Sequence, residues 1–244
     1  MTALVLILAS IPSVLFFFFL RNNREDPEYK KTCAGVFWKG VICAAVIILA
    51  DFALQIAWNA TGLGEKSPLV NELFRCFILF AGVEETVKFL TAKKNGLKKY
   101  SGVSRLDVIA FMAIAAIGFG LNEDIVYAMQ TNIGQIIVRG ALMGHVAYGL
   151  LMGLLYGKGL VKDSKALKAL ALILPIFFHG LYDFSLVDWM PDAFAFVAVL
   201  SAFASTVFII VMIFFIRKKR KDPSFAESIF KEDEQTGSTD DQEG

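Results

Sequence analysis

The chain has 244 residues, of which 56% are hydrophobic and only 19% charged, and its formal net charge is +1. Soluble globular domains contain about 45–50% apolar and about 25% charged residues, so this composition excludes a soluble domain and predicts an integral membrane protein. Membrane proteins distribute their charged residues unequally between the two sides of the membrane, so the small net charge does not indicate whether the protein binds nucleic acid. We expect the lipid bilayer as partner and no nucleic acid. Cys33, Cys43 and Cys76 show no metal-type pairing, which predicts buried free thiols.

Windows of about 20 apolar residues, the length that crosses a hydrocarbon core about 30 Å thick, recur seven times along the chain. We therefore predict an all-α, polytopic bundle of seven transmembrane helices. The predicted spans are residues 2–20, 35–58, 69–92, 107–129, 134–157, 167–186 and 193–216. The first is predicted to be a retained span and not a signal peptide, because no basic segment precedes it and Arg21 and Arg24 follow its long apolar run.

Lysine and arginine gather in alternate loops. Several follow each of the first, third, fifth and seventh spans, whereas the other connections contain a single basic residue, Lys66. By the positive-inside rule, the N-terminus is outside and the C-terminus cytoplasmic. Residues 1–216 are thus predicted to form one transmembrane domain, and residues 217–244 a basic juxtamembrane segment followed by an acidic, disordered cytoplasmic tail.

The third span contains the sequence FAGVEETVKFL, which places Glu84, Glu85 and Lys88 among apolar residues. One ionisable group at a bilayer centre costs about 2.5–3.5 kcal/mol on insertion scales, so three within five residues indicate a function. Lys88 lies four residues after Glu84 and three after Glu85, so it can pair with either carboxylate on the helix surface. The other carboxylate is then prepared to act as a base or acid near neutral pH. The alternative is a structural ion pair beside one protonated glutamate.

The next three spans carry further polar groups. The fourth contains GFGLNEDIVYA, with the acidic residues Glu123 and Asp124; for Asp124 the alternative is a solvated helix end. The fifth contains His145, whose alternative is a histidine bonded to a neighbouring carbonyl. In the sixth, His179 and Asp183 are one turn apart, so the carboxylate can orient one ring nitrogen and leave the other for a substrate.

Polar side chains inside a membrane must face the protein interior or one another. We therefore expect the carboxylates and imidazoles of four spans to gather at one water-accessible cavity. The expected catalytic residues are Glu84, Glu85, Glu123, His145 and His179, and the expected supporting residues are Lys88, Asp183 and Asp124.

Four motifs occur in order within residues 70–186: EExxK from Glu84, GFGxxE ending at Glu123, a lone His145, and HxxxD from His179. This order resembles the PrsW family of intramembrane proteases, which are distantly related to the CAAX prenyl proteases and bacteriocin-processing enzymes. The resemblance implies a glutamic-type peptidase that cuts membrane proteins, in bacteria typically anti-sigma factors. It thus implies a multi-pass protein of the bacterial plasma membrane, with a single-span protein as substrate.

Three positions depart from these patterns. The CAAX relatives have an arginine one residue beyond the position of Lys88 and a histidine where this chain has Glu123. PrsW-like chains often have asparagine where this one has Asp124. The CAAX substrate class is therefore not carried over to this chain.

The expected mechanism uses an activated water, because no serine or cysteine among the motif residues has a base at helical spacing. Glu84 would take a proton from water, aided by His145, and later protonate the leaving amine. His179, held by Asp183, would stabilise the oxyanion, and Glu85, paired with the neighbouring lysine, would hold the helix. The spacing does not separate the roles of Glu84 and Glu85.

Two alternatives remain open. We expect no cofactor, but Glu84, His145 and His179 are also a ligand set for zinc, which would make the protease metal-dependent. Intramembrane glutamates and histidines also build proton relays, so a proton-coupled transporter or a receptor-like scaffold is the non-enzymatic alternative.

Overall fold

The computed structural model describes residues 2–130, 143–191 and 194–229. In these ranges every named element is helical and no strand occurs, which confirms the predicted all-α class. Four helices are long and apolar enough to cross a membrane. They are α2 (Pro27–Ala60), α6 (Arg105–Gln130), α9 (Lys165–Ser185) and α10 (Ala195–Lys219).

The other predicted spans also correspond to helices, some of them interrupted. The third span is divided into three consecutive segments, α4 (Pro68–Leu73), the π-helix η1 (Phe74–Phe80) and α5 (Ala81–Ala92). The remaining elements are α1 (Thr2–Arg21), α3 (Leu63–Lys66), η2 (Lys93–Leu97), α8 (Gly144–Val161) and α11 (Pro223–Ala226). The predicted tail lies, from residue 230 onward, outside the described residues.

The fifth span differs from its prediction as a continuous helix over residues 134–157. Residues 131–142 lie outside the described part of the chain, and α8 begins only at Gly144. Met143 has a φ of 44°, a left-handed conformation that is incompatible with an α-helix through this position. His145 is therefore in the first turn of α8 and not near the middle of a longer helix.

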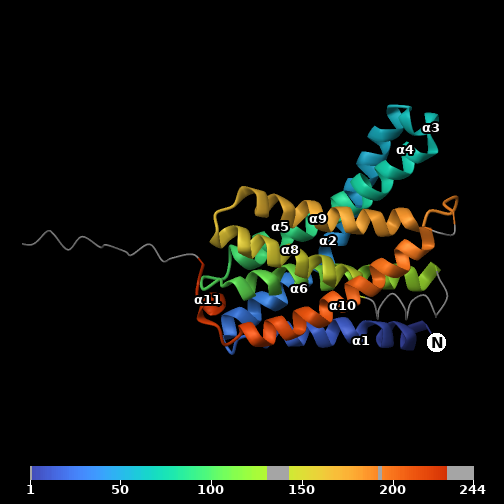
Figure 1. Cartoon of the computed structure of the whole chain (residues 1–244). Coiled ribbons are helices and arrows are strands. Elements are labelled where there is room, and N and C mark those ends of the chain that lie inside the picture. The colour runs from blue at the N-terminus through green and yellow to red at the C-terminus, as the bar shows by residue number, and fades with distance from the viewer. Residues whose placement is uncertain (1, 131–142, 192–193, 230–244) are drawn as a thin grey trace, which may run out of the picture.

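Helix α6 lies at the centre of the bundle, between α1, α2 and α8 (Figure 1). Every residue of α6 from 106 to 119 except Gly118 contributes a buried hydrophobic or polar side chain. Gly118 itself allows close packing against α2, because a Cβ atom there would lie 2.3 Å from the carbonyl oxygen of Phe37. On the other side, a Cβ atom on Gly153 of α8 would lie 2.5 Å from Cα of Ile109. Small residues thus bring three helices together, as is common in membranes.

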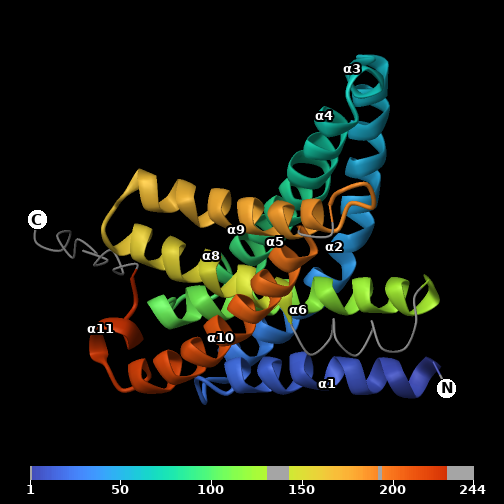
Figure 2. The same cartoon turned by 45° about the vertical axis from the view of Figure 1, so that its right-hand side comes forward.

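The C-terminal part of α2 and helix α4 project together beyond the rest of the bundle (Figure 2). The indole of Trp58 stacks on the ring of Phe74 at 4.1 Å and donates a hydrogen bond of 3.0 Å to the side chain of Asn71. Large apolar side chains on this part of α2, including Leu49 and Phe52, are about two-thirds exposed in the isolated chain. A lipid environment accounts for such a surface.

At the opposite end of the bundle, Asp107 joins three segments. Its carboxylate accepts hydrogen bonds from the guanidinium of Arg24, at 2.9 and 2.7 Å, and from the backbone N–H of Ser104. The hydroxyl of Ser104 in turn accepts from the N–H of Asp107, so the two residues form a capping box at the start of α6. The three cysteines are buried free thiols, as predicted.

Candidate active site

The residues of the EExxK motif lie on α5, directly after the seven-residue π-helix η1. The backbone N–H of Ala81 donates to the carbonyl of Cys76, five residues earlier, where an α-helix would use the residue four earlier. Such wide turns are frequent at functional sites, because each one rotates the helix that follows relative to the helix before it. Here Glu84, Glu85 and Lys88 are all buried against the bundle.

The ammonium group of Lys88 lies at the centre of the site. It donates to Glu84 at 3.1 Å and to Glu85 at 2.8 Å, so it pairs with both carboxylates at once. It also lies 3.0 Å from Nδ1 of His145 and 4.0 Å from the ring centre of Phe119. Lys88 is 1% exposed, so these contacts replace its hydration.

His145 connects α8 to both α5 and α6. An ammonium can only donate a hydrogen bond, so Nδ1 of His145 accepts from Lys88 and its proton is on Nε2. The N–H at Nε2 donates a hydrogen bond to the carboxylate of Glu123 on α6. Two of the expected catalytic residues, from two helices, are thus fixed relative to Lys88.

Glu85 orients the second histidine. Its carboxylate oxygen Oε1 lies 2.9 Å from Nδ1 of His179, whereas Asp183 is 3.4 Å from Nε2 of the same ring. The sequence predicted that Asp183 holds one nitrogen of this imidazole; in the structure Glu85 bonds Nδ1 and Asp183 lies beside Nε2. Glu85 is fully buried, and its second oxygen has no hydrogen-bond partner among the described residues.

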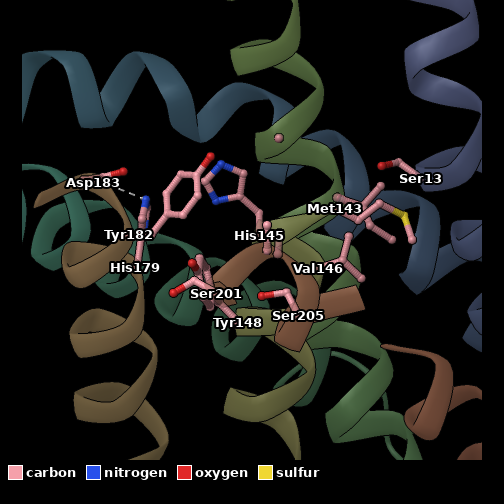
Figure 3. A pocket seen from close by; sticks show the side chains of 15 residues that line it. Ser13, Met143, His145, Val146, Tyr148, His179, Tyr182, Asp183, Ser201 and Ser205 are labelled. Carbon is pink, nitrogen blue, oxygen red and sulfur yellow. Dashed lines mark ion pairs between the residues drawn. The ribbon is translucent and has the colours of Figure 1, made fainter. Parts of the chain in front are cut away.

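A large cavity of about 650 Å³, which we call the vestibule, opens on one side of this cluster. Glu84, Glu123, His179 and Asp183 all line it, together with Asp51 of α2. A second, smaller cavity of about 70 Å³ lies on the other side of His179, where His145, Tyr148 and residues of α10 form its wall (Figure 3). His179 and Asp183 therefore border both spaces.

Burial separates the two adjacent glutamates, which their spacing left equivalent. Glu84 lines the vestibule, and its Oε2 lies 3.9 Å from Nε2 of His179. Glu85 lines neither cavity and makes its contacts with Lys88 and His179 inside the protein. Of these two glutamates, Glu84 is the one placed to meet a water molecule or a substrate.

Sequence analysis missed Tyr148. Its ring stacks on the imidazole of His179 with centres 5.2 Å apart and planes 19° apart, and it lines the smaller cavity. The available signal was its position three residues after His145, on the same face of a helix. The side chain of Asp124, a predicted supporting residue, lies outside the described part of the structure.

The residues of the zinc alternative also come together here. Ligand atoms of Glu84, Glu85, His145 and His179 lie within 4.8 Å of one another, and carboxylate and imidazole are ordinary zinc ligands. However, Nζ of Lys88 already lies between 2.8 and 3.1 Å from three of these four residues. A metal ion about 2 Å from the same atoms would lie against an ammonium group, so the arrangement does not fit a metal while Lys88 holds this position.

Comparison with known proteins agrees with these motifs. A family model described as PrsW family intramembrane metalloprotease matches residues 28–216, a range that contains all four motifs. The chain belongs to the PrsW family. It is similar to the protease PrsW of Halalkalibacterium halodurans, with 28% identity over 75% of this chain and 82% of that protein. It is also similar to the proteases PrsW of Clostridioides difficile, with 26% identity over 74% and 78% of the two chains, and of Bacillus subtilis, with 24% identity over 73% and 81%. No solved structure gives a significant match.

The comparisons confirm the predicted resemblance to PrsW proteases and, with the apolar helices, indicate a bacterial integral membrane peptidase. The family description includes a metal, whereas the position of Lys88 in this chain argues against one.

Proposed function

We propose that this PrsW-family protein is a glutamic-type intramembrane peptidase, in which Glu84 activates the water that hydrolyses a peptide bond of a membrane-spanning protein. The observation that carries the proposal is the position of Glu84. It is the one glutamate of the EExxK pair that borders the vestibule, and it also contacts Lys88 and faces His179.

In this mechanism Glu84 accepts a proton from water in the vestibule as the water oxygen attacks the carbonyl carbon. The same carboxyl group then donates the proton to the leaving amine, a role typically worth about 10²–10⁴ in rate. Lys88, which is bonded to Glu84 at 3.1 Å, keeps the side chain in place. A carboxylate held by a cation beside a cavity large enough for water meets the geometric requirement for a general base.

The histidines have different tasks. With Nδ1–H bonded to Glu85, His179 presents Nε2 toward the vestibule, where its protonated form donates to the developing oxyanion. His145 is bonded to Lys88 and Glu123, so it positions the ammonium and the acidic side chain of α6. Glu85 is a positioning residue, because it touches Lys88 and His179 and lines neither the vestibule nor the smaller cavity.

We further propose the topology and the substrate class. In this proposal the seven predicted spans cross the plasma membrane of a bacterium, with the N-terminus outside and residues 217–244 in the cytoplasm, and the site lies within the membrane. The alternation of basic loops supports this orientation. The proposed substrate is a single-span protein of the anti-sigma-factor type, which is the substrate class that the resemblance to the PrsW family implies.

The test uses the purified protein in liposomes with a single-span reporter protein. The native chain is expected to cleave the reporter after dialysis and in the presence of a chelator, and Glu84→Gln to leave it intact. Loss of cleavage on chelation, restored by zinc, would instead support a metalloprotease. An intact reporter together with solute uptake that depends on Glu84 would support a proton-coupled transporter.

A further inference from the structure

An apolar groove of about 450 Å³ runs along α10 where this helix crosses α8 and α9. The α10 residues that line it recur every three or four positions, so they form one face of the helix. They are Val197, Leu200, Ser201, Ala204, Ser205 and Phe208. From the first to the last of them α10 rises by roughly 16 Å, which gives a partner helix about three turns of contact.

This groove lies next to the candidate active site. Tyr148, Ser201 and Ser205 line both the groove and the smaller cavity, and Figure 3 shows these three side chains together beside His145. His179 in turn lines both the smaller cavity and the vestibule. The groove, the smaller cavity and the vestibule therefore follow one another and share lining residues, from the apolar surface to the space beside Glu84.

We propose that this groove, which we call the α10 groove, docks the transmembrane segment of the substrate as a helix. The proposal rests on the function proposed above and names the surface that the substrate binds. Ser201, Ala204 and Ser205 are small, and Ala147 of α8 lies opposite them, so a second helix can approach the α10 backbone closely. Helix association in lipid depends on small residues and interhelical hydrogen bonds, and a lipid acyl chain has no donor or acceptor for the two serine hydroxyls.

The size of the smaller cavity limits how much of the substrate helix can enter the site. About 70 Å³ holds a few water-sized groups and not a helix, so the helix stays in the α10 groove. Only a locally unwound stretch passes Tyr148 to reach His179. The carbonyl groups released by unwinding need hydrogen-bond donors inside the membrane, and the hydroxyls of Ser201 and Ser205 lie where the groove meets the cavity.

A photo-cross-linking experiment tests the docking step apart from the chemistry. Benzoylphenylalanine is introduced at Leu200, in the groove, or at Val199, which is 66% exposed on another face of α10, in the Glu84→Gln background. The full chain is placed in phosphatidylethanolamine–phosphatidylglycerol liposomes with the single-span reporter. We expect several-fold more reporter adduct from Leu200 than from Val199. Equal yields from the two positions, or adducts of Leu200 with lipid alone, overturn the proposal.

A second experiment fills the groove. Ala204→Trp places a large side chain on the groove face, and Phe203→Trp places the same indole at a neighbouring position that is 65% exposed on a different face. Both positions are on the surface of the isolated chain, so both variants are expected to fold, which their thermal unfolding checks. We expect kcat/KM for the reporter to fall by about tenfold or more in Ala204→Trp only. Equal activities of the two variants contradict docking at this surface.

The two proposals fail separately. If the native chain cleaves the reporter but Leu200 yields no selective adduct, the α10 groove is not the docking site and the peptidase proposal stands. If Leu200 yields a selective adduct with a reporter that the native chain leaves intact, docking stands and hydrolysis is rejected.

Discussion

Nζ of Lys88 lies 3.0 Å from Nδ1 of His145, although the two residues are 57 positions apart in the chain. The same ammonium bonds both glutamates of the EExxK motif, so a cation supplied by the protein takes the position that a bound metal would need. Removal of the Lys88 ammonium is therefore expected to change both the stability of the protein and its affinity for a metal ion.

Replacing Lys88 with methionine, which has a similar length, is expected to leave Glu84 and Glu85 buried without their cation. Breaking a buried ion pair in this way typically lowers the free energy of unfolding by about 3–5 kcal/mol. The ligand atoms of the two glutamates, His145 and His179 then have no ammonium group between them, so we expect the variant to bind zinc. Metal analysis after zinc loading and dialysis checks this, with the native chain as control. Stoichiometric zinc in the native chain would show that Lys88 leaves the site to admit a metal.

Glu84→Gln and Glu85→Gln are expected to have different effects. Glu84 borders the vestibule, so its amide variant should fold normally and lose activity by at least about 10²-fold. Glu85 is fully buried and bonded to Lys88 and His179, so its variant should lose activity and also unfold at a lower temperature. Cleavage rates and thermal unfolding of both variants provide the comparison. Equal unfolding temperatures of the two would contradict the division of roles.

Gly118→Ala tests the packing of α6 on α2. The added Cβ would lie 2.3 Å from the carbonyl oxygen of Phe37, so a backbone must shift, and we expect a loss of about 1–3 kcal/mol. The matched control is Gly35→Ala on α2, where nothing lies within 4 Å of the new atom. There the higher helix propensity of alanine should raise stability by up to about 1 kcal/mol. Denaturation of both variants in the same detergent measures the difference, and losses of equal size would refute the close contact.

Asp107→Ala removes the carboxylate that joins Arg24 to the start of α6. The carboxylate is fully buried and also caps the helix at Ser104, so we expect its loss to lower stability by about 3 kcal/mol. Glu25→Ala is the control, because Glu25 pairs with Lys30 at the surface and its side chain is 91% exposed. Thermal unfolding should fall clearly for the first variant and stay unchanged for the second. A similar response of the two would mean that Asp107 has no special role.

The sequence by itself determined the class of protein and the chemical groups of the site. An apolar composition with few charges indicates a membrane protein, runs of about 20 apolar residues indicate that helices cross the membrane, and ionisable residues in such helices must meet one another. This argument identified Glu84, Glu85, Lys88, His145 and His179 before any contact was known. It also indicated the family, because four motifs in a fixed order are specific.

Only the tertiary structure decided which atoms meet. The π-helix before α5, the start of α8 at Gly144 and the close packing of α6 set the rotation of each helix, and these depend on contacts between segments far apart in the chain. Helical spacing predicts neighbours on one helix but not the helix opposite. For this reason the partnership of Glu85 with Nδ1 of His179 and the stacking of Tyr148 could not be predicted from the sequence.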